Sequence, residues 1–491
     1  MTTTRAWMRW TLPLLLAICI ARLWILPLWS SFWVDEMATA FVVRYGASHW
    51  SFAVAPQVPE SIYYLLPRAS QWIAGLSEPA YRLPSVLCMG VALFFIAKLA
   101  ARLIHPDAAW FAVFASLGMR GIDYHAADAR PYALGICVAV VALYALVRWL
   151  DTAKLLYAAA FVAAGALLWR VQLVYWPYYL ALALYAAFRA DSPVHRLRRL
   201  AAFALVGLTL IPVALNAMAL LRQAGSHVMT AEPTPRVAEH LLRWNLVLIC
   251  AAGAWLAGRG GSPSPRRSPS STLLIFAAWL VQPLSLYAFS HASGDSVFLN
   301  RYLSIMLPGT ALAATWAASQ FLPLARWRPA SLVLGAGVLA VMGQWTTLYP
   351  AHEHSHWRSA ARAVNAAIPP GGYVIAPSPF VEARWPVWRP DYPLPSFLYA
   401  HLSVYTLQGH VLRFPFESSP EAEAYARSLL PQLTVAGDFA IYGGAGNTRY
   451  WRNWFAAAPA LAGWTNTLTE FGDVYVVLFN TPSTPAPLPS R

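Results

Sequence analysis

The chain has 491 residues, of which 58% are hydrophobic and 11% are charged, and its formal net charge is +14. Because soluble globular domains carry about 25% charged residues, this composition excludes an ordinary water-soluble protein. The four cysteines lie in apolar stretches without CxxC spacing, which argues against a zinc or redox motif. The composition therefore predicts a polytopic α-helical membrane protein.

Apolar segments follow one another along the first 350 residues, and we expect about eleven transmembrane helices. The first segment follows Arg5 and Arg9 and continues without a small-residue cleavage motif, so we interpret it as a retained anchor. A perpendicular span needs about 20 residues, which makes the third and fifth segments the shortest candidates. The segments run over about 10–29, 83–104, 108–119, 131–149, 155–169, 171–188, 200–221, 241–257, 272–290, 302–322 and 330–348.

Lysine and arginine alternate between loops, and short loops rich in these residues stay on the cytoplasmic side. Arg5 and Arg9, Lys98 and Arg102, and later pairs up to Arg326 and Arg328 all fall on one side of an eleven-span topology. We therefore expect a protein of the plasma (inner) membrane with a cytoplasmic N-terminus. The topology explains the positive charge. The sequence lacks the basic clusters interleaved with aromatic residues that are typical of nucleic-acid binding.

The composition changes after residue 350, which predicts a transmembrane domain at 1–350 and an extracytoplasmic α/β domain at 351–480. In the second domain, WRSAARAVNAAI predicts a helix, and GYVIAP, DFAIYGG and DVYVVLF predict strands. Ser419 is the expected N-cap of a further helix that begins at Pro420. The stretch GRGGSPSPRRSPSS is typical of a flexible linker, and 481–491 is expected to be a disordered tail.

Adjacent carboxylates, Asp35 and Glu36 in SFWVDEMATA, follow the first apolar segment and open a first outer loop of about 30–82. Carboxylates this near hydrocarbon are costly unless they have a function or a partner. The alternative is that both residues merely stabilise the positive end of a short helix at the membrane interface.

Two further clusters of ionisable residues lie at the outer ends of apolar segments. GIDYHAADARPYAL contains Asp123, His125, Asp128 and Arg130, and its alternative interpretation is a solvated turn before a helix. HASGDSVFLNRYLSIMLPG contains Asp295 and Arg301 at the start of the tenth segment. Here the alternative is an arginine that extends to the lipid headgroups.

Together the three clusters combine carboxylates, which accept protons or hold a divalent cation, with arginines, which neutralise phosphate. Two other motifs carry less weight. His352, His354 and His356 in AHEHSHW have an alternating spacing that would place metal ligands on one face of a strand, but short histidine tracts are typical of solvated loops. Gly443 and Gly444 in IYGGAGN could approach a phosphate, but they have the composition of a turn after a strand.

The chain resembles the membrane glycosyltransferases of the GT-C superfamily, particularly the protein mannosyltransferase and aminoarabinose transferase relatives and the RgtA/B/C/D-like group. The stretches that carry this resemblance are SFWVDEMATA, SIYYLLPRASQWIAGLSEPAYRLPSVL, DARPYAL, NRYLSIMLPG and HWRSAARAVNAAIPPGGYVI. Such enzymes transfer a sugar from a polyprenyl-phosphate carrier to a lipid, protein or glycan acceptor on the outer face, usually with inversion. The resemblance implies the same activity here.

The resemblance also implies roles for individual residues. Asp35 would be the general base, Glu36 would support it or hold a cation, and Asp128 would belong to the same catalytic group. His125, Arg130, Tyr132 and Tyr302 would contact substrate, and Arg301 would hold the carrier phosphate. A divalent cation (Mg, Mn or Ca) would be the only cofactor, with Glu36 and His125 as candidate ligands.

One departure from the resemblance concerns the sequence before the YYLL run. Relatives often carry a His-Pro-Pro-type sequence there, whereas this chain has Gln57, Pro59 and Glu60. The main alternative function is a polysaccharide or lipid-linked sugar flippase, for which charged residues should lie near the middle of spans. An O-antigen ligase or polymerase would carry its large outer loop between late spans. The sequence has no GxGxxG motif after an expected strand, so it does not predict a nucleotide-binding domain.

Overall fold

The computed structural model describes residues 3–221, 231–259 and 268–482. Most of the expected linker and most of the expected tail at 481–491 lie outside the described residues. Contacts divide the chain into two compact units. The membrane unit comprises Met1–Leu28 and Ser61–Pro350, and the α/β unit comprises Trp29–Glu60 and Ala351–Arg491.

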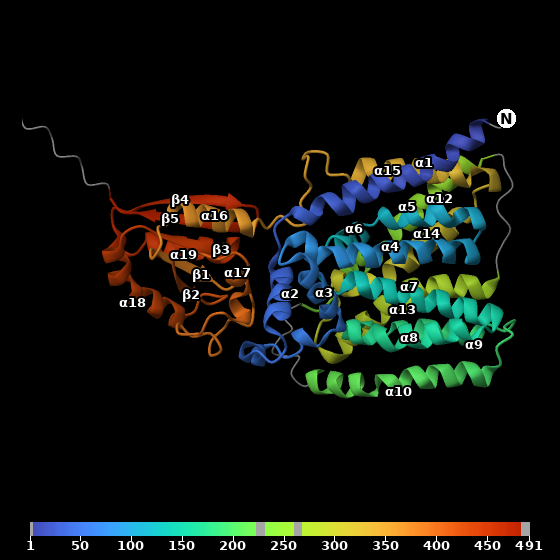
Figure 1. The fold of residues 1–491 in the computed structure, drawn as a ribbon, viewed down its shortest axis with the longest axis horizontal. Coiled ribbons are helices and arrows are strands. Elements are labelled where there is room, and N and C mark those ends of the chain that lie inside the picture. Colours follow the sequence, from blue (N-terminus) through green and yellow to red (C-terminus); the bar gives the residue numbers. More distant parts are fainter. Residues whose placement is uncertain (1–2, 222–230, 260–267, 483–491) are drawn as a thin grey trace, which may run out of the picture. The chain divides into compact units, whose positions relative to one another are not determined.

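The membrane unit is built from helices that run side by side (Figure 1). Among the described residues, six helices are long and apolar enough to cross a membrane, or seven if a bent pair counts as one span. The chain is therefore a multi-pass membrane protein, and the count of eleven spans stays a prediction. The helices are α1 (Thr3–Ile20), α3 (Leu65–Ala74), α4 (Glu78–Leu103), α5 (Ala109–Leu117), α6 (Arg120–Ala126), α7 (Tyr132–Thr152), α8 (Leu155–Val171), α9 (Tyr178–Phe188), α10 (Arg196–Leu221), α11 (Pro235–Leu241), α12 (Trp244–Gly258), α13 (Pro269–Ser293), α14 (Leu307–Ser319) and α15 (Trp327–Met342).

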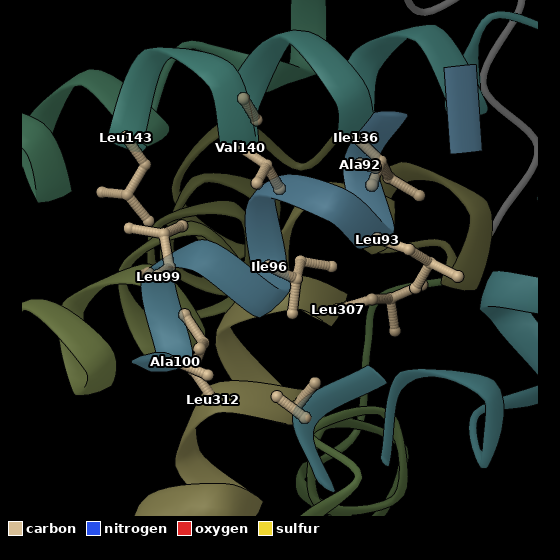
Figure 2. Close-up of a cluster of buried hydrophobic side chains, with 14 of the residues drawn as sticks. Ala92, Leu93, Ile96, Leu99, Ala100, Ile136, Val140, Leu143, Leu307 and Leu312 are labelled. Atoms are coloured by element: carbon tan, nitrogen blue, oxygen red, sulfur yellow. The ribbon is translucent and has the colours of Figure 1, made fainter. Parts of the chain in front are cut away.

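Three of these helices, α4, α7 and α14, meet in the core of the membrane unit. Figure 2 shows Leu93 and Ile96 of α4 near Leu307 of α14, and Leu99 of α4 near Leu143 of α7. Lipid tails are as apolar as leucine, so these helices associate through close packing rather than through the hydrophobic effect. Helix α7 is 72% buried over its most apolar window, whereas α10 is 11% buried, so α7 is central and α10 peripheral.

The α/β unit contains a five-stranded sheet in the order β2-β1-β3-β5-β4 (Figure 1). Strands β1, β2 and β3 are parallel, and β5 pairs antiparallel with both β3 and β4. The expected strands β1, β3 and β5 are confirmed, and β2 and β4 are strands that the sequence analysis missed. The bounds are β1 (Tyr373–Pro377), β2 (His410–Phe414), β3 (Phe439–Gly444), β4 (Thr465–Phe471) and β5 (Val474–Asn480).

The same unit also contains the helices α16 (Trp357–Ala367), α18 (Pro420–Ala436) and α19 (Ala445–Ala456). The expected helices at α16 and α18 are confirmed, and the Ser419 hydroxyl accepts a hydrogen bond from the Ala422 N–H at 3.2 Å, as an N-cap should. The turn expected at Gly443 and Gly444 is wrong, because both glycines belong to β3 and α19 begins at the next residue.

The segment Trp29–Glu60 folds as part of the α/β unit, although it precedes the rest of that unit by some 290 residues of sequence. Its helix α2 (Val34–Tyr45) packs against the short helix α17 (Ala400–Val404). The Phe32 N–H donates to the Tyr405 hydroxyl at 2.8 Å, and the Phe397 N–H donates to the Ser51 hydroxyl at 3.0 Å. The Asp-Glu pair is therefore held by the C-terminal part of the chain.

Candidate functional site

The Asp-Glu pair lies in the first turn of α2, where the chain changes from extended at Trp33 to helical at Val34. The Glu36 carboxylate accepts a hydrogen bond from the Trp33 N–H at 3.2 Å, and its side chain is fully buried. A carboxylate at this position satisfies a backbone donor that the helix leaves without an intrahelical partner and interacts favourably with the helix dipole. The helix start thus gives Glu36 a structural role, and its neighbour Asp35 is half buried in the same turn.

His352 is a second buried polar residue near this helix start. Its ring and the Glu36 carboxylate each offer a ligand atom, and these atoms lie within 4.8 Å of each other. The His352 N–H donates to the Ser30 hydroxyl at 3.1 Å, which ties it to the same segment. His354, by contrast, is exposed, and its carbonyl accepts a hydrogen bond from the Asp473 N–H. The three histidines therefore do not share one metal-binding face.

In the membrane unit, α6 and the turn that follows it contain Asp123, His125 and Asp128. All three side chains are buried, with exposed fractions of 9%, 3% and 0%, so the interpretation of this segment as a solvated turn is wrong. The His125 Nδ1 and Asp128 Oδ2 atoms are 4.0 Å apart, and the His125 ring lies 4.8 Å from the Tyr132 ring at the start of α7. The Ser85 hydroxyl on α4 fixes the turn by donating to the Asp128 carbonyl at 2.6 Å.

Asp123 has a different environment from Asp128. Burial raises the pKa of the Asp123 carboxyl well above its usual value, although the hydrogen bond from Trp24 acts in the opposite direction. The Trp24 indole N–H donates to Asp123 Oδ1 at 2.9 Å. The raised pKa favours the protonated, uncharged carboxyl group, which suits a structural partner of the first membrane segment.

The expected arginine site lies on a short 3₁₀ helix, Asn300–Met306, between α13 and α14. The Arg301 guanidinium lies 5.6 Å from the centre of the Tyr302 ring. The Tyr302 carbonyl accepts a hydrogen bond from the Gln282 amide on α13 at 2.8 Å. This helix also packs against α6 and α7, so the structure brings the element with Arg301 and Tyr302 to the elements with His125 and Tyr132.

Arg243 is a neighbour of this site that the sequence analysis missed. Its guanidinium donates to the Asn300 side-chain oxygen at 2.8 Å, next to Arg301 in sequence. It lies between α11 and α12, whose axes differ by 48°, and its backbone is left-handed with a φ of 53°. Single non-glycine residues with this backbone are uncommon and often mark functional sites. The sequence signal was a lone arginine that interrupts the apolar run LLRWNLVLIC.

Arg82 is a fully buried arginine on α4, within one of the stretches that carry the sequence resemblance. Its guanidinium donates to the carbonyls of Pro27 and Leu28 at 3.1 and 3.0 Å. These carbonyls end the first membrane segment, so Arg82 fixes the point from which the chain leaves the membrane unit.

Comparisons with known proteins agree with this architecture. Residues 61–218 match the family model of dolichyl-phosphate-mannose-protein mannosyltransferases. The fold resembles the crystal structure of ArnT from Cupriavidus metallidurans in the apo state, with a TM-score of 0.59, 12% identity, and coverage of 97% of this chain and 98% of that chain. The same enzyme bound to undecaprenyl phosphate gives a TM-score of 0.56, 13% identity, and coverage of 95% and 97%.

A third solved structure, the archaeal oligosaccharyltransferase AglB from Archaeoglobus fulgidus in complex with an inhibitory peptide and a dolichol-phosphate, has a TM-score of 0.46 and 11% identity. It covers 100% of this chain and 76% of that chain. No curated protein matches the sequence. The family model and the fold of ArnT confirm the resemblance to the GT-C membrane glycosyltransferases that the short sequence motifs indicated.

Proposed function

We propose that this protein transfers a sugar from a polyprenyl-phosphate-linked donor to an acceptor hydroxyl on the outer face of the plasma membrane, with inversion at the anomeric carbon. The observation that carries the proposal is the buried cluster of His125 and Asp128 on elements that contact the helix of Arg301. The related fold of ArnT, which was solved bound to undecaprenyl phosphate, supports a lipid-phosphate carrier as the donor.

In the proposed reaction, the acceptor oxygen attacks the anomeric carbon, and the bond from that carbon to the carrier phosphate oxygen breaks. Negative charge grows on the phosphate as it leaves, and fixed positive charge lowers this barrier. Arg301 and Arg243 are the proposed phosphate ligands, because a guanidinium binds phosphate through two parallel hydrogen bonds. Arg130, Tyr132 and Tyr302 would shape the sugar and carrier site with His125 and Asp128.

Asp35 is the proposed general base that removes the proton from the acceptor hydroxyl. The Asp35 side chain is half buried at the first turn of α2, next to Glu36, whose carboxylate accepts the hydrogen bond from the Trp33 N–H. A carboxylate within hydrogen-bond reach of the acceptor hydroxyl can serve as the proton acceptor in such a transfer. Asp128, with its carboxylate 4.0 Å from the His125 ring, would orient that ring toward substrate.

A divalent cation fits the pair of Glu36 and His352, whose ligand atoms lie within 4.8 Å. A carboxylate with an imidazole suits manganese or zinc better than calcium, which prefers oxygen ligands alone. A bound cation would supply positive charge near the start of α2. His125, the other candidate from the sequence, lies in the membrane unit beside Asp128.

The same proposal sets the orientation of the chain. The N-terminus would be cytoplasmic, as the loop charges predict, and the domain expected at 351–480 would be extracytoplasmic and would select the acceptor. The flippase alternative is disfavoured, because His125, Asp128 and Arg301 lie on short elements between the long apolar helices rather than at their middles.

Reconstituted protein tests this proposal directly. A panel of radiolabelled polyprenyl-phosphate sugars is incubated with proteoliposomes and extracted envelope acceptors. Label that moves from carrier to acceptor supports a transferase, and carrier that crosses the bilayer without transfer supports a flippase.

A further inference from the structure

The α/β unit contains a groove that the proposed transfer reaction does not use. It is lined by Glu417, Ser418, Asn447, Tyr450 and Trp451 and encloses about 270 Å³. Small-molecule sites begin near ~300 Å³, so the groove has about the size needed for one ring of a larger ligand.

The groove lies at the carboxyl ends of the parallel strands. Glu417 and Ser418 come shortly after β2, and Asn447 and Tyr450 lie on α19, which starts where β3 ends. Strand β1 lies between β2 and β3, and all three run in the same direction. In α/β sheets, ligands bind in the crevice outside the carboxyl ends of strands whose connections lead to opposite sides, which is the arrangement around β1.

Aromatic and polar groups line this groove together. Tyr450 is 36% exposed, and its ring stands at 90° to that of the buried Trp451, with the ring centres 5.1 Å apart. The Tyr450 hydroxyl donates to Glu423 Oε1 at 2.6 Å, which fixes the orientation of the exposed ring. The amide of Asn447 and the hydroxyl of Ser418 add donors and acceptors to the same wall.

The charges around the groove are balanced. Glu417 pairs with Arg384 at 2.7 Å, and Glu423 pairs with Arg427 at 2.9 Å. A phosphate in the groove would meet the carboxylate of Glu417. An ordered aromatic ring beside a carboxylate and an amide suits a neutral, hydroxyl-rich ligand better than an anionic one.

We propose that this groove binds a neutral oligosaccharide, with one sugar ring against Tyr450 and its hydroxyls hydrogen-bonded to Glu417 and Asn447. In the context of the proposed function, on which this role rests, the groove would hold an acceptor glycan at the α/β unit. The binding itself requires no transfer chemistry, so it can be measured separately.

The test uses the full-length protein in lipid nanodiscs, with Asp35→Asn so that no turnover occurs. Titration calorimetry measures the affinity for neutral gluco-, manno-, galacto- and N-acetylhexosamine oligosaccharides of six units, and for hexagalacturonate as an anionic counterpart. We expect at least one neutral oligosaccharide to bind and hexagalacturonate not to bind. Loss of an aromatic contact should weaken binding by about fivefold to tenfold in Tyr450→Ala, whereas Tyr450→Phe should retain most of it.

Tyr373→Ala is the matched control, because Tyr373 is the first residue of β1 and lies at the amino ends of the parallel strands, whereas the groove lies at their carboxyl ends. It should bind like the parent protein. If no neutral oligosaccharide binds, or if Tyr450→Ala binds as tightly as Tyr373→Ala, the groove proposal is wrong. Absence of transfer by the protein without Asp35→Asn, with binding and its Tyr450 dependence intact, would instead count against the proposed function alone.

Discussion

The hydroxyl of Tyr405 accepts a hydrogen bond from the backbone N–H of Phe32 at 2.8 Å, across 373 residues of sequence. The Ser31 hydroxyl lies 3.4 Å from the same oxygen. These contacts, with the packing of α2 on α17, attach the segment that carries Asp35 to the C-terminal part of the chain. The proposed base is therefore positioned by residues far from it in sequence.

Tyr405→Phe should loosen this attachment. The Phe32 N–H would lose its acceptor, and an unmade buried hydrogen bond costs about 1–3 kcal/mol. Faster hydrogen exchange over residues 32–36 and a several-fold drop in transfer rate are expected, with folding retained. Tyr475→Phe, which removes a hydroxyl that Arg449 contacts at 2.6 Å in the same unit, should change neither quantity. Unchanged exchange at 32–36 in Tyr405→Phe would show that Tyr405 does not position α2.

Asp123 and its partner Trp24 provide a test of protonation. Burial raises the pKa of the Asp123 carboxyl well above its usual value and so favours its neutral form, and Asp123→Asn keeps a neutral side chain with an acceptor for the indole N–H. Asp123→Asn should therefore preserve both thermal stability and transfer. Asp123→Ala leaves the Trp24 N–H without its acceptor and should lower stability by about 1–3 kcal/mol. A large loss of activity in Asp123→Asn would mean that the carboxylate is charged and takes part in the reaction.

Arg243 and Arg301 should act on donor binding. Hydrogen bonds to charged groups contribute about 1.5–3 kcal/mol each, so Arg243→Ala or Arg301→Ala should raise the KM for the donor by about tenfold to a hundredfold. Steady-state kinetics with varied polyprenyl-phosphate sugar measures this, and the KM for the acceptor should change little. Arg328→Ala is the control, since Arg328 is half exposed and lies 3.9 Å from Asp107. An unchanged donor KM in both variants would remove these arginines from the phosphate site.

The sequence predicted the contacts between site residues that are close together in the chain, but not those between residues that are far apart. His125, Asp128 and Tyr132 lie within eight residues, so their proximity followed from the sequence alone. The contact of the Arg301 helix with α6 and α7 depends on helix packing, for which the sequence carries no local signal. Arg243 was missed because the features that distinguish it are structural. These features are its left-handed backbone and its hydrogen bond to Asn300.

For the fold, too, local sequence patterns predicted individual elements but not the packing of distant segments. Long apolar runs predicted α4, α7, α10 and α13, since length and hydropathy alone define a span. Strand β2 was missed because five residues at a sheet edge give a weak pattern. Strand β4 is the opposite edge, and its mostly polar sequence TNTLTEF is largely solvated. Neither the loop composition nor its length indicated that residues 29–60 fold with the C-terminal part of the chain.

The α/β unit should lose stability in acid because of His401. This histidine on α17 is fully buried among the rings of Trp357, Tyr442 and Tyr399, and neither ring nitrogen has a hydrogen-bond partner among the described residues. Burial lowers the pKa of His401 to about 3. Since the folded-state pKa lies below the unfolded-state value, its effect is absent above pH ~6.5, and stability falls as the pH drops from there toward 3.

His401 alone changes the free energy of unfolding by at most about 1.4 kcal/mol per pH unit. Hydrogen exchange of β1 and β3 in the full-length protein, corrected for intrinsic rates, measures it between pH 7 and pH 5. His401→Phe keeps an aromatic ring without a titrating group and should show a smaller acid loss. An equal acid loss in both proteins would show that other groups control the pH dependence.

In the proposed function, the chain is a polyprenyl-phosphate-sugar transferase whose base is Asp35. Transfer from labelled carrier to envelope acceptor by the purified protein in lipid, compared with that of Asp35→Asn, tests it most directly. We predict carrier-dependent incorporation by the parent protein and a loss of at least about a hundredfold in the variant, because removing a general base typically costs ~10²–10⁴ in rate. Thermal stability of the variant should be retained. Equal incorporation by a folded Asp35→Asn protein, or no incorporation by the parent protein with any carrier, would contradict this account.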